Sequence, residues 1–207
     1  MNDGETGDAV FDTDVRYRYL LWRTWDPDLP RVGFIMLNPS SADGDRDDPT
    51  LRRCRGFARA WGFGGLGVAN LFALRSVDPL SLQSCRDAVG GENERYLVKL
   101  AETVDTVVAA WGNGGAWQGR GSHVRRMLAE HPLFCLGVTV QGEPRHPLYV
   151  PSAAQLKPLG YETVMSMRVA GLPPNVPTVK AWPPTTIAIA APARFAQSSP
   201  PLGKSTR

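Results

Sequence analysis

The segment Phe34-Ile-Met-Leu-Asn-Pro-Ser-Ser-Ala-Asp43, followed closely by Asp47-Asp-Pro-Thr50, decides how this chain folds. An apolar run stops at Asn38-Pro39, and small polar and acidic residues follow before a helix begins. Because proline disfavours helical backbone in the residue before it, the chain at Asn38 stays extended. The pattern is typical of a buried strand that delivers polar side chains to the edge of a sheet.

Three further segments combine a predicted strand with polar or small residues: Val68–Phe72, Val107–Gly112 and His146–Tyr149. In sheets of parallel strands, ligands bind beyond the carboxyl ends of the strands. All four segments lie at or just past such ends, so we expect them to converge on one site.

The core is predicted to alternate strands with helices. Strands are expected at residues 17–25, 32–37, 66–72, 104–111 and 133–138, and helices at 49–61, 92–103 and 122–130. Asp48 fits the N-cap of the first helix, with Pro49 at its first position and Gly62 after its last. The alternation predicts an α/β protein whose mostly parallel sheet carries helices on both faces.

The two ends of the chain differ in composition from the core. Residues 1–15 carry five acids and no base, whereas residues 168–207 contain eight prolines and no acid. Such segments cannot bury enough apolar surface to offset the entropy that ordering removes. We therefore expect a disordered lead at 1–15, a single α/β domain at 16–165 and a disordered, proline-rich tail at 166–207.

The bulk composition of the 207-residue chain indicates a soluble globular protein. Hydrophobic residues make up 43% and charged residues 21%, and no apolar run approaches the roughly 18 residues of a membrane span. Three widely spaced cysteines do not form a disulfide pattern, so a cytoplasmic location and no membrane partner are expected. The net charge of +3 permits a nucleic-acid partner without requiring one.

Three polar side chains, Asn38, Asn70 and His146, follow three different predicted strands. Each alone is more often structural, because a buried amide or imidazole needs hydrogen-bond partners. Their joint placement favours a site. The glycine-rich segment 111–115 can expose backbone N–H groups to an anion, and Arg52 lies on a basic helix face that is either solvated or in contact with phosphates.

The acidic loop Asp43–Asp48 resembles a calcium loop only in its odd-numbered acids. It lacks the glycine at the sixth position, and Cys54 stands where the twelfth position needs a glutamate, so an EF-hand is excluded. A loosely bound magnesium ion at Asp47 and Asp48 is one alternative. The other is a solvated loop whose acids favour the N-terminal end of the following helix. No other metal and no cofactor is expected.

Residues 16–160 resemble a mostly bacterial family known as domain of unknown function 1643. The matching segments are Ile35-Met-Leu-Asn-Pro-Ser40, Asp47-Asp-Pro-Thr50, Asn70-Leu-Phe-Ala-Leu-Arg75, Asp78-Pro79, Gly90 with Glu92-Asn93, Ala110-Trp-Gly112 and His146-Pro-Leu-Tyr149. This resemblance covers most of the core and implies no particular activity.

The order of motifs is also similar, more distantly, to that of the uracil-DNA glycosylase superfamily. Members have an Asp-Pro or Asn-Pro motif, a strand ending near an asparagine, a strand ending in Trp-Gly and a His-Pro loop. The resemblance implies a three-layer sandwich with a central, mostly parallel four-stranded sheet. It also implies that Asn38 and His146 are catalytic. Together with the glycine segment and the basic helix face, the expected substrate-binding residues are Pro39, Ser40, Ser41, Asn70, Trp111, Gly112, Asn113 and Arg52.

Two departures from that superfamily affect the chemistry. Asn38 stands where the fastest members carry an aspartate, and an amide can orient water but cannot accept its proton as a general base. Leu148 stands where the usual His-Pro-Ser motif has its serine.

The leading hypothesis is therefore a glycosylase-like domain that binds, and processes, a nucleobase or nucleotide, either free or within nucleic acid. One alternative is a non-catalytic nucleic-acid-binding or regulatory module. Another is a small-molecule hydrolase that uses Ser40 or Ser41 with His146.

Overall fold

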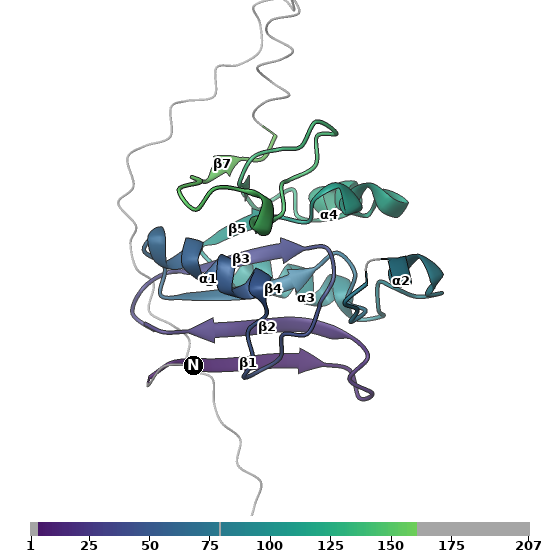
Figure 1. Cartoon of the computed structure of the whole chain (residues 1–207), viewed down its shortest axis with the longest axis horizontal. Coiled ribbons are helices and arrows are strands. Elements are labelled where there is room, and N and C mark those ends of the chain that lie inside the picture. Colours follow the sequence, from purple (N-terminus) through teal and green to yellow (C-terminus); the bar gives the residue numbers. More distant parts are fainter. Residues whose placement is uncertain (1–3, 79, 161–207) are drawn as a thin grey trace, which may run out of the picture. The chain divides into compact units, whose positions relative to one another are not determined.

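A mixed seven-stranded sheet forms the centre of residues 4–78 and 80–160, the part of the chain that the computed structural model describes (Figure 1). Along the sheet the strand order is β1-β2-β4-β3-β5-β6-β7. The strands are β1 (Thr6–Phe11), β2 (Arg18–Thr24), β3 (Arg31–Met36), β4 (Gly65–Asn70), β5 (Thr106–Ala109), β6 (Leu133–Cys135) and β7 (Lys157–Pro158).

Four neighbouring strands, β4, β3, β5 and β6, run parallel to one another. An antiparallel pair, β1 and β2, extends the sheet beside β4, and β7 adds an antiparallel strand beside β6. The predicted α/β architecture with parallel strands is confirmed. The predicted sheet of four strands is wrong in size, because the antiparallel strands at the two edges also belong to it.

Helices pack on both faces of the sheet (Figure 1). Residues of α1 (Pro49–Ala60) pack against one face, and residues of α3 (Asn93–Thr103) pack against the other. The other helical segments are α2 (Leu80–Ser84), α4 (Arg120–Met127) and two 3-10 segments, η1 (Asn113–Gly119) and η2 (Pro147–Tyr149).

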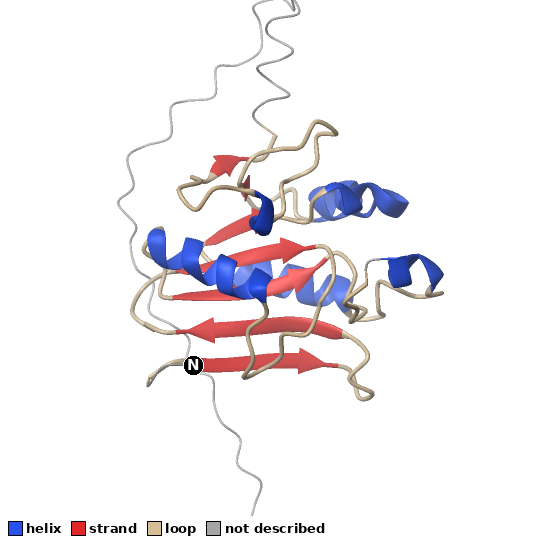
Figure 2. Cartoon of the chain, viewed as in Figure 1, coloured by secondary structure: helices blue, strands red, loops and turns tan. Residues whose placement is uncertain are grey.

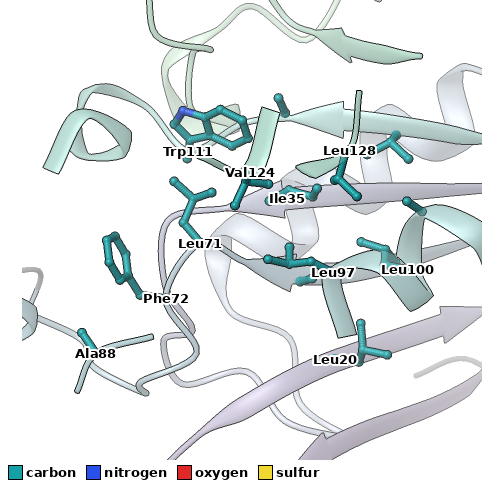
Figure 3. Packing of buried hydrophobic residues seen from close by; sticks show 14 of the residues in the cluster. Leu20, Ile35, Leu71, Phe72, Ala88, Leu97, Leu100, Trp111, Val124 and Leu128 are labelled. Atoms are coloured by element: carbon teal, nitrogen blue, oxygen red, sulfur yellow. The ribbon is translucent and has the colours of Figure 1, made fainter. Parts of the chain in front are cut away.

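Strand β3 shows why both faces need a cover. Val32 and Phe34 belong to the hydrophobic cluster that includes α1, whereas Ile35 belongs to the cluster that includes α3. Successive side chains of a strand point to opposite faces, so a strand that is apolar at nearly every position is stable only between two layers. Figure 3 shows Ile35 close to Leu97 of α3, with Leu100 further along the same helix.

Helix α1 begins as the sequence predicts. The side chain of Asp48 accepts a hydrogen bond from the backbone N–H of Leu51 at 2.7 Å, and Pro49 occupies the first turn, where its missing N–H costs nothing. The predicted apolar stripe is buried at Leu51, Cys54 and Ala58. The cap fixes the direction in which the chain leaves the acidic loop.

The predicted disordered lead at residues 1–15 is wrong for the residues from 4 onward. Residues 6–11 form the edge strand β1, which pairs antiparallel with β2. Glu5, next to this strand, pairs with both Arg55 and Arg59 of α1, and Asp12 accepts a hydrogen bond from the backbone N–H of Tyr17 at 2.7 Å. Two of the acids that make the lead look disordered therefore hold it in place.

The predicted proline-rich tail at 166–207 and the domain boundary at 165 lie outside the described residues. Within residues 4–78 and 80–160, no helix is both long enough and apolar enough to cross a bilayer.

Two glycines allow a matched test of the packing between β4 and α3. A Cβ atom on Gly67 would lie 2.5 Å from Cδ1 of Leu100 and 2.5 Å from the ring of Trp22, whereas a Cβ on Gly56 of α1 would meet no atom within 4 Å. We expect Gly67→Ala to lower the free energy of unfolding by about 1–3 kcal/mol through overpacking.

The control, Gly56→Ala, should raise the free energy of unfolding by about 0.5–1 kcal/mol, because alanine is the better helix former. Urea denaturation measures both values. Equal effects of the two substitutions would contradict the close approach of β4 to α3.

Candidate functional site

The reversal of strand order at β3 creates a crevice. The chain leaves β3 through α1, which packs on one face of the sheet, and returns as β4 on one side of β3. It then leaves β4 through α3, on the opposite face, and returns as β5 on the other side of β3. The loops that follow β3 and β5 therefore separate at the carboxyl edge, where ligands of such sheets bind. Figure 2 shows β3 and β4 ending on the same side of the sheet, with loops beyond their arrowheads.

A pocket of about 580 Å³ opens at this edge. Of the residues predicted to form a site, it brings together Asn38, Ser40, Trp111, Gly112, Asn113 and His146. Asp48 also lines it. Four predicted residues are not among the lining residues: Pro39, Ser41, Asn70 and Arg52.

The loop after β3 is tied to the loop after β4 by hydrogen bonds that continue the parallel ladder. Leu71 N–H donates to the carbonyl of Met36 at 2.8 Å, and Ser76 N–H donates to the carbonyl of Pro39 at 2.9 Å. Asn38 closes the same connection, because its Nδ2 donates to the carbonyls of Ser76 at 2.9 Å and Pro39 at 3.1 Å. These contacts hold the Asn38 side chain in one orientation.

This orientation decides what Asn38 offers to a ligand. A carbonyl oxygen can only accept a hydrogen bond, so the amide nitrogen of Asn38 faces the two carbonyls and its Oδ1 atom points away from them. No hydrogen bond among the described residues uses that Oδ1 atom, and Asn38 lines the pocket. The site therefore presents an acceptor at Asn38, which suits a water molecule or a ligand N–H group.

His146 offers the complementary group. Its Nδ1 accepts the N–H of Leu148 at 3.4 Å, so the neutral ring carries its proton on Nε2, which no described residue engages. Burial lowers the pKa of His146 below its ordinary value, and the carboxylate of Asp48 opposes part of that shift. At neutral pH the site therefore presents a neutral imidazole with a free Nε2–H donor.

The glycine segment after β5 owes part of its composition to packing. A side chain on Gly115 would collide with the indole of Trp111, and one on Gly114 would reach Leu37 at 2.6 Å. Two of the amides expected to meet an anion are used internally, since Gly112 N–H donates to Pro144 at 2.7 Å and Gly115 N–H to Gly112 at 3.1 Å. Trp111 is only 2% exposed, so its ring is chiefly a packing element.

Arg18 also lines the pocket, and no sequence pattern singles it out. It opens β2, whose antiparallel direction brings its first residue to the edge where the parallel strands end. It is 3% exposed and donates to the carbonyl of Ala42 at 2.7 Å and to Oδ1 of Asn70 at 3.4 Å. Asn70 is 1% exposed and is absent from the lining, so the group that reaches the pocket here is Arg18.

The acidic loop is held by ion pairs. Asp47 binds Arg23 through one oxygen at 2.9 Å and Arg55 through the other at 2.5 Å. Asp48 caps α1, and Arg52 donates from the exposed face of that helix to the carbonyl of Asp47 at 2.8 Å. Both carboxylate oxygens of Asp47 are thus occupied by arginines, which argues against the magnesium alternative. In residues 4–78 and 80–160, no group of three His, Cys, Asp or Glu side chains could hold a metal.

The structure is that of an α/β protein with a mixed sheet and a pocket at the carboxyl edge of its parallel strands. Residues 18–148 match the model of the family described as Protein of unknown function (DUF1643), and the chain belongs to that family. The predicted resemblance to domain of unknown function 1643 is thereby confirmed. The comparisons with curated proteins and with solved structures gave no match.

The ion pairs of Asp47 predict a pH-dependent loss of stability. Burial alone would raise the pKa of Asp47, but hydrogen bonds from Arg55 and Arg23 outweigh it, so the pKa is lowered in the folded protein. The stabilisation is therefore complete above the unfolded pKa of about 3.9 and is lost as the pH falls through the lower folded value. We expect Asp47→Asn to cost about 2–4 kcal/mol at pH 7.

Urea denaturation of the wild type and Asp47→Asn between pH 7 and pH 2 tests this expectation. The difference between the two proteins should shrink at the acid end. The control is Asp45→Asn, at an exposed position of the same loop, which should change the free energy of unfolding by less than about 0.5 kcal/mol. A constant difference at every pH would contradict the ion-pair account.

The ring of His146 can be examined directly by NMR. Titration with ¹⁵N-detected imidazole shifts should show the Nε2–H tautomer at neutral pH and a pKa below the ordinary value of about 6.5. Asp48→Asn keeps a good N-cap but removes the charge that raises this pKa, so it should lower the pKa further. An Nδ1–H tautomer, or a pKa raised by Asp48→Asn, would contradict the described geometry.

Proposed function

We propose that the pocket binds a nucleobase attached to its sugar and hydrolyses the N-glycosidic bond between them. One observation carries this proposal: an oriented acceptor, Oδ1 of Asn38, and a neutral donor, Nε2–H of His146, belong to the same pocket. Cleavage of this bond builds positive charge on the sugar and negative charge on the departing base. A pocket with a water-orienting acceptor and a separate donor matches both needs.

In the proposed reaction the bond from the sugar C1′ atom to the base nitrogen breaks, and its electron pair leaves with the base. The oxygen of a water molecule bonds to C1′. Asn38 orients that water by accepting one of its hydrogens, and the proton that the water loses goes to solvent, because an amide is not a base. His146 donates a hydrogen bond to the carbonyl oxygen of the base, on which charge develops.

The neutral state of His146 suits this role. A neutral imidazole that keeps its Nε2 proton stabilises a developing oxyanion without adding a full charge to the resting pocket. The lowered pKa keeps the ring neutral at physiological pH. The donor is therefore ready in the form the reaction needs.

The pocket has the size and the lining that a nucleoside needs. Its volume of about 580 Å³ falls within the range of small-molecule sites. Tyr149 is 78% exposed and lines it, and its ring lies 5.6 Å from that of His146. Stacking of a base on an exposed aromatic ring contributes about 1–3 kcal/mol, which makes Tyr149 the expected stacking surface.

We further infer a three-layer, glycosylase-type fold for the core. The four parallel strands are ordered second, first, third and fourth along the chain, with α1 and α3 on opposite faces. Such doubly wound sheets bind nucleotides where the order reverses, which here is the crevice beside Asn38. The fold supports a nucleotide ligand but does not by itself identify a reaction.

The alternative of a serine hydrolase has less support. Ser41 is exposed and does not line the pocket, and no hydrogen bond joins Ser40 to His146 among the described residues. A nucleophilic serine would need a base within hydrogen-bond distance. The alternative of a non-catalytic nucleic-acid-binding or regulatory module differs from the proposal in whether a base is released.

Base release tests the proposal. The protein is incubated with oligonucleotides that carry uracil, hypoxanthine or an alkylated base, and with the corresponding free nucleosides and nucleotides, and released base is measured by chromatography. We expect His146→Ala and Asn38→Ala each to lower the rate by roughly 10²–10³-fold, the effect of losing one preorganised polar group. The matched control, His131→Ala, replaces a histidine outside the pocket and should leave the rate within about twofold.

Release that both pocket variants leave unchanged would overturn the proposed roles. Binding of these compounds without release of any base would favour the non-catalytic module.

A further inference from the structure

Arg18 is a buried cation without an anionic partner in the described part of the chain. Its guanidinium donates to a backbone carbonyl and to the neutral amide of Asn70, and its Nε atom is buried with no hydrogen-bond partner. None of the ion pairs of the described residues includes it. An uncompensated buried charge is costly, so such a group is commonly completed by something that binds to it.

The charged groups around Arg18 are already committed to other partners. Asp48 uses its side chain to cap α1, and Asp43 accepts the backbone N–H groups of Asp45 and Arg46 at 3.1 Å and 2.8 Å. Arg23 and Arg75 also influence Arg18, but both are cations, and their charges lower its pKa. Burial lowers the pKa of Arg18 to about 10, which leaves it protonated at neutral pH.

Two other features of the same pocket favour an anion. Helix α1, 12 residues long, begins at the pocket, since Asp48 and Thr50 both line it, and the N-terminal end of a helix carries a partial positive charge. Arg145 lines the pocket as well and is exposed to solvent, with its Nε donating to the carbonyl of Val138 at 3.0 Å. Asp48 is the acid of the lining, so the two arginines exceed the lining acids by one charge.

The depth of Arg18 limits what kind of anion can reach it. The side chain is 3% exposed, so only a group at the end of a molecule can enter far enough to meet the guanidinium. An internal phosphodiester would have to bring a chain segment on each side of it to the same buried position. A terminal phosphate monoester fits the fork of donors on arginine and enters alone.

Building on the nucleotide-binding function proposed above, we propose that Arg18 binds the terminal phosphate of a free mononucleotide. The ligand would then be a nucleoside monophosphate and not a base within a nucleic-acid strand. The phosphate meets Arg18 near the start of α1, the base faces His146 and Tyr149, and Arg145 stands closer to solvent.

Isothermal titration calorimetry tests this inference on the full-length protein. The probes are the 5′-monophosphates of uridine, cytidine, adenosine and guanosine, the four parent nucleosides, and trinucleotides that carry each base in the middle and no terminal phosphate. We expect at least one monophosphate to bind about tenfold or more tightly than its nucleoside, because a hydrogen-bonded charge pair is worth that much or more. The matching trinucleotide should bind no better than the nucleoside.

Two variants assign the effect to one arginine. Arg18→Gln should abolish the preference for the phosphate while leaving nucleoside affinity within about threefold. Arg120→Gln, the control, removes another buried arginine that is paired with Glu94 and does not line the pocket, so it should keep the preference. Circular dichroism and thermal melting establish that each variant is folded, and the comparison of ligands on the wild type decides the question even if Arg18→Gln does not fold.

Equal affinity for a monophosphate and its nucleoside, tighter binding of the trinucleotides, or no binding of any monophosphate would each overturn the inference. Base release is measured separately on the same compounds. A phosphate preference without release refutes the proposed reaction and keeps the role of Arg18. Release of a base without a phosphate preference refutes the role of Arg18 and keeps the proposed reaction.

Discussion

The pairing of β3 with β4 on one side and with β5 on the other is the constraint on which the rest of the structure depends. Since the two crossovers run over opposite faces, β3 is buried on both sides and must be apolar almost throughout. After Arg31 at the start of the strand, the next polar side chain is Asn38, which lies past the end of β3. The loops after β3 and β5 diverge at that same edge. Core packing and pocket position thus have one cause.

Polar groups in this protein fall into those that hold the loops and those that remain available. Buried Asn93 donates to the carbonyls of Asn70 and Leu71 at 3.2 Å and 2.9 Å, and Arg120 donates to the latter at 3.0 Å, which fixes the turn after β4. Both carboxylate oxygens of Asp47 are likewise paired with arginines, Arg23 and Arg55. The acceptor of Asn38 and the donor of His146 have no hydrogen-bond partner among the described residues, Arg18 keeps a buried Nε atom without one, and all three residues line one pocket.

Sequence reasoning predicts what local patterns determine. The cap at Asp48, the extent of α1 and the polar end of β3 follow from short-range chemistry, and all are present in the structure. Contacts between distant segments are not predictable in this way. Glu5, one of the acids that suggest a disordered lead, pairs with two arginines of α1, and Arg18 reaches the pocket because β2 runs antiparallel to β4. The position of Asn70 at the end of a strand predicts a pocket residue, yet in the structure its Oδ1 accepts a hydrogen bond from Arg18, and Arg18 is the residue that lines the pocket.

The claim that the crevice beside β3 is the ligand site can be tested by mapping backbone amide shifts in ¹H–¹⁵N NMR spectra during titration with a mononucleotide. The account predicts that the largest changes gather in three segments that are distant in sequence: 37–40, 112–114 and 145–149. Changes concentrated elsewhere, for example around Arg125 of α4 and His131 beyond the end of that helix, would contradict it. So would the absence of any change at saturating ligand.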